Sequence, residues 1–232
     1  FQCRRMRKFR HGPVFFAGDS AHQVSPFGAR GANSAVQDAD NLGWKLDLVL
    51  KGLADDSLLD TYGSEREFGA DENILNSTRS SNFMTPKSKV SQTFRNAVLS
   101  LAKKHTFARP IVNSGRLSVP CTYDDFTLFG VNGFDGPAAS RPGATCPDAQ
   151  VDDGYLLEQL GMDFVLLAIG GDAPKPVTAH GITTRIMHIA QPTLQVSDRY
   201  LGQQVMAVYL VRPDQHVVAR WAEYDAKAIT NA

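Results

Sequence analysis

The Gly-Asp pair at Gly18 and Asp19 is the feature of this sequence with the clearest potential for chemistry. It opens the segment GDSAHQVSPFGARGAN, residues 18–33. A glycine before an aspartate at the end of a strand lets the backbone turn tightly and leaves a carboxylate facing a cleft. A carboxylate in that place is suited to accept hydrogen bonds from the hydroxyls of a sugar or polyol. The pair therefore predicts a binding site for such a ligand.

Small residues follow in the same segment at Gly28, Gly31 and Ala32, just before a helical pattern that starts near Asn33. Small side chains let a flat ligand approach the backbone, and the free N–H groups in the first turn of a helix favour negative charge. A cofactor that becomes anionic on reduction would be stabilised at such a helix end.

A strand, a glycine-rich loop and a helix must position these groups. Residues 14–17 are an apolar run typical of a short buried strand, which Gly18 would end. Apolar residues then recur at helical spacing, at Val36, Ala39, Leu42, Leu46, Val49 and Leu53. Gly52 is the predicted C-cap of this helix. The same order also suits a plain strand–turn–helix in which Asp19 only caps a turn, because a glycine loop alone is weak support for a site.

The rest of the chain divides by composition. Ser57 is a candidate N-cap for a second helix, and a third helical pattern places apolar residues on one face, at Val90, Phe94, Val98, Leu101 and Ala102. Prolines and glycines interrupt residues 106–148. Strand-like runs follow at 164–170, 182–190 and 205–211, and RPDQ at 212–215 predicts a hairpin that pairs 205–211 with 216–221.

Composition excludes several classes of protein. Lys and Arg total 24 and so do Asp and Glu, so the chain lacks the basic excess of a nucleic-acid-binding protein. No apolar run approaches the roughly 20 residues of a membrane span. The three cysteines, Cys3, Cys121 and Cys146, are widely spaced and form no CxxC motif. We therefore expect no disulfide framework, no metal site and a reducing cytoplasm.

At residues 18–50 the sequence closely resembles the second flavin-binding motif of the class A flavoprotein aromatic hydroxylases. The matching residues are Gly18-Asp19, Ala21-His22, Pro26, Gly28 with Gly31, Asn33, and Asp38 through Leu46. The following LLDTYGSER, residues 58–66, resembles the next helix of that family.

This resemblance implies a role for each matching residue. Asp19 would hold the ribityl chain of FAD, and Pro26 would lie beside the isoalloxazine ring. The backbone of Gly31, Ala32 and Asn33 would meet the pyrimidine edge, with Gly18 and Gly28 completing the cofactor-binding motif. His22 would support the motif rather than transfer protons. NAD(P)H would reduce the flavin, which would use O2 to hydroxylate a phenolic ring.

Some residues depart from the family pattern. Arg30 stands where many members carry Gln, Ser25 precedes Pro26 where Pro-Pro is common, and Glu67-Phe68 replaces the usual Pro after a Glu-Arg pair. These departures leave the aromatic substrate open. No GxGxxG lies at a strand-to-helix junction, and the chain begins with Phe1 rather than Met. We therefore expect the C-terminal part of a longer enzyme, whose dinucleotide-binding unit and catalytic side chains lie upstream.

A second resemblance concerns the C-terminal region. Residues 141–170 and 208–221 resemble the thioredoxin-like tail of the phenol hydroxylase branch of the family. A working thioredoxin needs a low-pKa cysteine after its first core strand, at a helix start. The corresponding place reads AIGGDAPKPV and holds no cysteine, and Cys146 precedes the strand. This domain is therefore expected to lack redox activity.

The fold prediction is an α/β chain in three parts. Residues 1–110 would be the C-terminal portion of an FAD-binding domain with long helices, 111–140 a connector, and 141–232 a thioredoxin-like domain. The expected partners are a small aromatic substrate and O2, with a homodimer left open. One alternative is a non-catalytic thioredoxin-like interaction or dimerisation module with a remnant of a flavin fold. A peroxiredoxin-like thiol enzyme is a further alternative, disfavoured because no cysteine follows residues 164–170.

Overall fold

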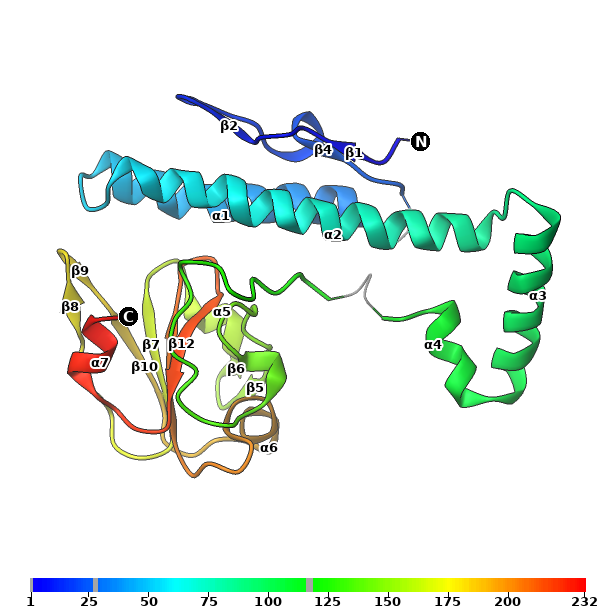
Figure 1. Cartoon of the computed structure of the whole chain (residues 1–232). Helices are drawn as coiled ribbons and strands as arrows, with labels where there is room; N and C mark the ends of the chain where they lie inside the picture. The colour runs from blue at the N-terminus through cyan, green and yellow to red at the C-terminus, as the bar shows by residue number, and fades with distance from the viewer. Residues whose placement is uncertain (1, 27–28, 116–118) are drawn as a thin grey trace. The chain divides into compact units, whose positions relative to one another are not determined.

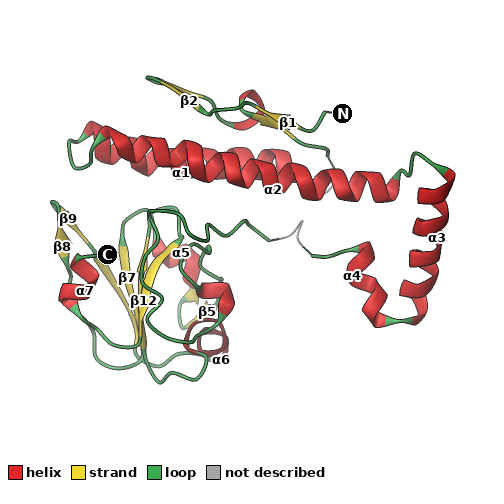
Figure 2. Cartoon of the chain, viewed as in Figure 1, coloured by secondary structure: helices red, strands yellow, loops and turns green. Residues whose placement is uncertain are grey.

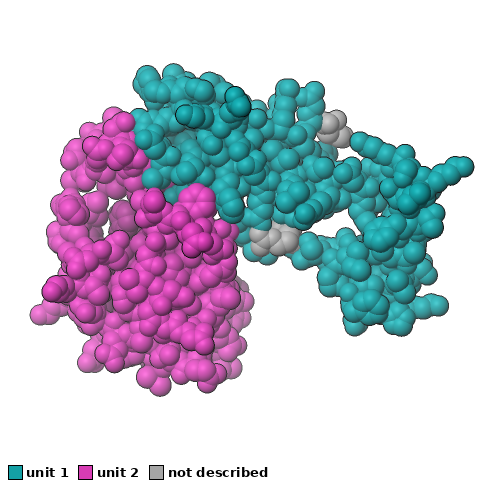
Figure 3. Space-filling view, in the orientation of Figure 1, with its two compact units in different colours: residues 1–43, 59–121 teal, residues 44–58, 122–232 magenta. Residues whose placement is uncertain are grey.

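The computed structural model describes residues 2–26, 29–115 and 119–232. Contacts within the chain define two compact units, one of residues 1–43 and 59–121 and the other of residues 44–58 and 122–232 (Figure 3). This division sets a boundary after Cys121 and gives residues 44–58 to the second unit. The domain limits at residues 110 and 140 stay a prediction.

Short antiparallel ribbons precede the helices of the first unit (Figure 1). Their strands are β1 (Arg4–Arg5) with β4 (His22–Gln23), and β2 (Arg10–His11) with β3 (Val14–Phe15). The predicted strand over residues 14–17 is thus shorter than expected, and it is not buried, since Val14 is exposed and Phe15 half-buried. Residues beyond Phe15 leave the ribbon and enter a 3₁₀ turn, Gly18–Ser20.

Two long helices form the body of the first unit (Figure 2). Helix α1 (Arg30–Leu50) begins three residues before Asn33, so Gly31 and Ala32 lie in its first turn. Helix α2 (Asp60–Met84) lies beside α1, as the side-chain bonds between Asp38 and Arg66 and between Ser34 and Asn73 show.

The ends of these helices differ in how well the sequence predicts them. Gly52 ends α1 as predicted: its φ is +70°, and its N–H donates to the Val49 carbonyl at 3.0 Å. The predicted N-cap at Ser57 is wrong. A 3₁₀ turn, Asp56–Leu59, contains Ser57, whose N–H donates to Asp55 Oδ1 at 2.9 Å, and α2 starts after that turn.

Helix α3 (Lys89–Lys104) follows, capped by Ser88, whose hydroxyl accepts the Ser91 N–H. A 3₁₀ turn, Thr106–Ala108, leads into the short α4 (Arg109–Val112). The predicted apolar residues do lie along α3, but within the described chain most of them are not buried in a core. Val98 is buried, whereas Val90, Phe94 and Leu101 are exposed.

The second unit is built on a mixed sheet of four strands within the described residues, in the order β10–β7–β11–β12. The strands are β7 (Val165–Ile169), β10 (Arg185–Ile189), β11 (Ala207–Val211) and β12 (Val217–Trp221). β7 and β10 run parallel, while β11 is antiparallel to both β7 and β12. The residues of β7 are buried, as its continuous apolar run predicts for a central strand.

The predicted hairpin from residue 205 to residue 221 is confirmed. Gln215 donates its N–H to the Arg212 carbonyl at 2.9 Å, which closes the turn, and Gln215 adopts a φ of +59°. The remaining elements of this unit are short. They are β5 (Gln150–Val151), β6 (Gly154–Tyr155), α5 (Leu156–Leu160), β8 (Thr178–Ala179), β9 (Ile182–Thr183), α6 (Leu194–Val196) and α7 (Ala226–Thr230).

The latter half of the predicted connector packs into this unit. Gly130 donates its N–H to the Val218 carbonyl and Gly133 to the Arg220 carbonyl, each at 2.9 Å, so this segment follows the edge of β12. Across the described residues, no helix has both the length and the apolar character that crossing a membrane requires.

Candidate functional site

Gly18 turns the chain against the first turns of α1. Its φ is +57°, a conformation that favours glycine. Its N–H donates to Asp38 Oδ2 at 2.8 Å, and a Cβ at this position would lie 3.0 Å from the Cβ of Ala35. A glycine is therefore required both by the backbone conformation and by the close approach of helix α1.

Asp38 anchors this turn from inside the protein. Its carboxylate is buried and lies 2.7 Å from both His22 Nε2 and Arg66 Nε. Burial alone would raise the pKa of Asp38, but the hydrogen bond from His22 and the charge and hydrogen bond of Arg66 outweigh it, so the pKa is lowered. The carboxylate is thus held ionised and ties α1, α2 and the Gly18 turn together.

His22 has a supporting position. The ring is buried and stacks on Phe9, with 5.8 Å between centroids. One ring nitrogen faces Asp38, and the ring has no direct access to solvent. This placement suits a residue that orients Asp38.

Asp19, the next residue after Gly18, is exposed. Its neighbour Ser20 bonds back to the Ala17 carbonyl at 2.7 Å, which closes the turn locally. Within the described residues, the Asp19 carboxylate accepts no hydrogen bond, so it is available to a ligand at the surface of the turn.

The first turn of α1 follows a tight bend. Ala29 has a φ of +51° and donates its N–H to the Pro26 carbonyl at 3.1 Å. The Asn33 amide nitrogen donates to the Ala29 carbonyl at 2.8 Å. Pro26, Ala32 and Asn33 are exposed and Gly31 is half-buried. Gly28, also predicted to bind the cofactor, lies outside the described residues.

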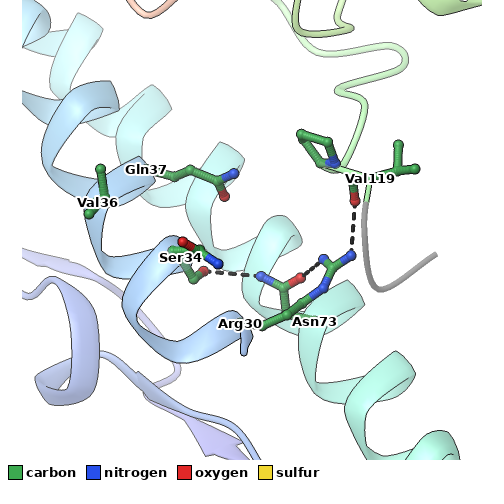
Figure 4. Close-up of a pocket in the computed structure, with 8 residues that line it drawn as sticks. Arg30, Ser34, Val36, Gln37, Asn73 and Val119 are labelled. Carbon is green, nitrogen blue, oxygen red and sulfur yellow. Dashed lines mark hydrogen bonds between the residues drawn. The ribbon is translucent and has the colours of Figure 1, made fainter. Parts of the chain in front are cut away.

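A cavity of about 410 Å³ lies beside the first turns of α1 (Figure 4). Its lining residues are Arg30, Asn33, Ser34, Val36, Gln37, Asn73, Val119 and Pro120. A chain of hydrogen bonds borders it: Asn73 donates to Ser34 Oγ at 3.0 Å, and Arg30 donates to Asn73 Oδ1 and, at 2.9 Å, to the Val119 carbonyl. The cavity combines apolar walls with a buried guanidinium and amide groups.

The structure brings only part of the predicted set to this cavity. Asn33 lines it, whereas Gly18 and Asp19 lie at the turn that packs on α1 near Ala35. Sequence reasoning missed Asn73 and the buried partner Arg66. The signal was present, because Arg66, Asn73 and Ser77 recur at helical spacing and are buried on α2. Because these residues are polar, apolar periodicity does not reveal this buried face of α2.

The Cys146 thiol is not a reactive centre. Cys146 is buried, and burial raises its pKa to about 12 despite a hydrogen bond with Tyr200. A thiol held protonated at neutral pH is a poor nucleophile. Among the described residues, no group of three or more His, Cys, Asp or Glu side chains is placed to hold a metal ion.

Comparisons with known proteins point to flavin chemistry. Residues 2–77 match the family described as FAD binding domain. The chain is 31% identical to the "Uncharacterized aromatic compound monooxygenase YhjG" of Bacillus subtilis (strain 168), in an alignment that covers 97% of this chain and 43% of that protein. It is 32% identical to the 4-methyl-5-nitrocatechol 5-monooxygenase of Burkholderia sp, over 97% of this chain and 44% of that protein.

A solved structure of the rebeccamycin biosynthetic enzyme RebC with reduced flavin has a similar fold. The TM-score is 0.70 at 25% sequence identity, and the match covers 97% of this chain and 45% of that one. The chain therefore spans less than half of the length of the curated relatives described above.

Proposed function

We propose that this chain, which is homologous to FAD-dependent aromatic monooxygenases and covers part of their length, holds the ribityl and isoalloxazine end of FAD in such an enzyme. One observation carries the proposal. Buried Asp38 fixes the Gly18 turn against α1 near Ala35, and this leaves the Asp19 carboxylate exposed at that turn.

The chemistry of these residues fits FAD. An exposed carboxylate can accept hydrogen bonds from the ribityl hydroxyls. The small residues Gly31 and Ala32 leave the backbone of the first helical turn open to a flat ring. The N–H groups of that turn carry partial positive charge, which complements an anionic reduced isoalloxazine.

Each residue in this proposal binds or orients the cofactor. Asp19 holds the ribityl chain, and Gly18 and Pro26 shape the loop around the ring. Gly28 belongs to this set by its place in the sequence motif. The backbone of Gly31, Ala32 and Asn33 meets the pyrimidine edge and stabilises negative charge on it. Bound FAD, reduced by NAD(P)H, supplies the activation of O2 for hydroxylation of an aromatic ring. We assign no catalytic side chain to this chain.

The names of the relatives support an aromatic substrate, since they are an aromatic compound monooxygenase and a nitrocatechol monooxygenase. The cavity beside Asn33 supports the same class, because Val36, Val119 and Pro120 give it apolar walls near the proposed ring site. A phenolic compound is the substrate class we propose for the whole protein.

The second unit is proposed to be thioredoxin-like and without redox activity. Its support is the strand order, with two parallel strands on one side of the sheet and an antiparallel hairpin on the other. After β7 the chain reads Gly170-Gly171-Asp172, with no cysteine at the position a thiol enzyme would need. The buried, protonated Cys146 supports the same conclusion.

The test uses the full-length protein of which this chain is part. We expect it to bind about one FAD per chain and to oxidise NAD(P)H faster when a phenol is added, with O2 consumed and a hydroxylated product released. A correctly folded full-length protein that neither retains FAD nor oxidises NAD(P)H with any phenol of a test panel would favour the non-catalytic alternative. Purified residues 1–232 alone should be colourless, because the adenine and pyrophosphate contacts are expected upstream.

A further inference from the structure

A largely exposed helical segment leaves the C-terminal end of α2 (Figure 1). We call residues 85–115, which include α3 and α4, the arm. Of its described residues, only Val98 and Ala108 are buried, whereas Val90 is 80% and Phe107 70% exposed. Isolated helices of this length are marginal in water, and grouped exposed apolar residues mark an interaction surface. We therefore expect the arm to bind a partner whose surface carries apolar side chains.

The arm is also strongly basic. Residues 73–123 contain no Asp or Glu. The arm itself carries Lys87, Lys89, Arg95, Lys103, Lys104 and Arg109. Its partner should therefore combine apolar side chains with negative charge.

A surface of the second unit has the opposite character. Residues 142–174 contain no Lys or Arg, and their acidic residues are Asp148, Asp152, Asp153, Glu158, Asp163 and Asp172. Two arginines from elsewhere in the unit contact this region: Arg185 lies 3.7 Å from Asp163, and Arg199 donates to the Asp148 carbonyl. Around the β5–β6 turn and α5, the exposed carboxylates of Asp153 and Glu158 accompany exposed Tyr155 and Met162. We call residues 148–163 the acidic surface. It offers the mixture of negative charge and apolar side chains that the arm requires.

We propose that the arm docks on the acidic surface of a second copy of the protein, and that the two copies exchange this contact reciprocally. The occupant is a second copy because this chain carries both complementary surfaces, and in an isologous two-fold dimer the arm of each copy meets the acidic surface of the other. An anionic lipid surface would attract the arm but repel residues 142–174, so it fits the chain less well. The inference stands independently of the flavin function proposed above.

Charge reversal tests this contact in the full-length protein. Lys103→Glu/Lys104→Glu in the arm, or Asp153→Lys/Glu158→Lys in the acidic surface, should each raise the dimer dissociation constant about tenfold or more, measured by analytical ultracentrifugation. Arg7→Glu/Lys8→Glu changes the same charge at exposed residues outside both surfaces and should leave it unchanged. Raising salt from about 50 to about 500 mM should weaken the native dimer, because screening shortens the reach of charges.

Mixing the two charge-reversed variants distinguishes contacts between copies from contacts within one copy. In the mixed dimer, one contact is native and the other pairs reversed charges, so dimerisation should recover toward the native value. An apolar variant, Phe94→Ser, should weaken the dimer, while Leu50→Ser, at an exposed residue outside both surfaces, should not. Melting curves identify any variant that fails to fold.

Three results would overturn the proposal. One is that the native protein stays monomeric at every concentration. If Phe94→Ser then also lowers the melting temperature, the arm packs against its own chain. Another is a dimer that is indifferent to all these substitutions. The third is failure of the mixed variants to recover when each is folded.

Discussion

Asp38 and Arg66 form an ion pair shielded from solvent, with Arg66 Nε 2.7 Å from Asp38 Oδ1, and this pair joins α1 to α2. The same carboxylate is hydrogen-bonded to the His22 ring and accepts the Gly18 N–H. The position of the exposed Asp19 thus depends on a buried charge in the neighbouring helix.

Removal of the Asp38 carboxylate should strongly destabilise the protein. Asp38→Ala leaves a buried guanidinium without its ion-pair partner, which should lower the free energy of unfolding by about 3–5 kcal/mol. Asp47→Ala, on the same helix, removes an exposed pair with Lys51 and should cost only about 0.3–0.5 kcal/mol. Urea denaturation compares the two. Similar losses would mean that the buried pair contributes little.

The contribution of Asp38 should depend on pH. Because its pKa is lower in the folded than in the unfolded protein, its stabilisation is complete above the ordinary value of 3.8 and is lost as pH falls through the lower, folded pKa. The difference in unfolding free energy between native protein and Asp38→Asn should therefore be constant from neutral pH to about 5 and shrink below about 4. A difference that does not change at low pH would contradict this assignment.

Two glycines with nearly the same backbone conformation allow the cost of that conformation to be distinguished from the cost of contact with α1. Gly12 has a φ of +58° and no atom within 4 Å of an added Cβ, whereas Gly18 has a φ of +57° and Ala35 at 3.0 Å. Gly12→Ala should cost about 1–2 kcal/mol from the left-handed conformation alone. Gly18→Ala should cost measurably more in the same denaturation assay. Equal effects would show that α1 does not press on the turn.

Asp19 should affect the cofactor more than the fold. Loss of a charge-assisted hydrogen bond of about 1.5–3 kcal/mol should weaken FAD binding about ten- to a hundredfold in Asp19→Ala of the full-length protein. Asp56→Ala, another exposed aspartate, is the control. Titration of apo-protein with FAD, with a melt recorded in its absence, gives both quantities. An unchanged dissociation constant with a lowered melting temperature would make Asp19 a turn residue only.

Cys146 should be unreactive in the native protein. With a pKa of about 12, its thiol stays protonated at pH 8 and should react with alkylating reagents only after unfolding. Cys3, which is half-buried, provides the comparison in the same sample. In the full-length protein, Cys146→Ala should keep most of the proposed monooxygenase activity. A hundredfold loss in a folded variant would revive the thiol-enzyme alternative.

The parts of the fold that the sequence predicts are those with strong local signals. The hairpin at Arg212–Gln215 and the C-cap at Gly52 each follow from turn chemistry within a few residues. The start of α2 escaped prediction because the Asp55 carboxylate, rather than Ser57, organises the turn before it. The exposure of the apolar face of α3 was not predicted, because periodicity shows that one side of a helix is apolar but not whether another element covers it.

For the candidate site, the sequence indicates the loop but not its support. Gly18 and Asp19 stand out because a glycine that permits a tight turn precedes a carboxylate, whereas Asp38 and Arg66 are far apart in the chain. Their pairing depends on the packing of two helices and has no local signature. Asn73 lies in the same interface between α1 and α2. There polar side chains replace the apolar stripe that a packed helix normally shows.

The second unit is discontinuous in sequence, because it includes residues 44–58 from the end of α1 and the loop after it. Trp44 packs edge-on against Phe164, with 5.6 Å between centroids, and the guanidinium of Arg212 lies 5.2 Å from its ring. A single recombination junction near residue 121 would deliver residues 122–232 without this tryptophan. The unit is therefore not one continuous segment of the chain. A protein that received residues 122–232 alone would lack the ring that packs against Phe164 and Arg212.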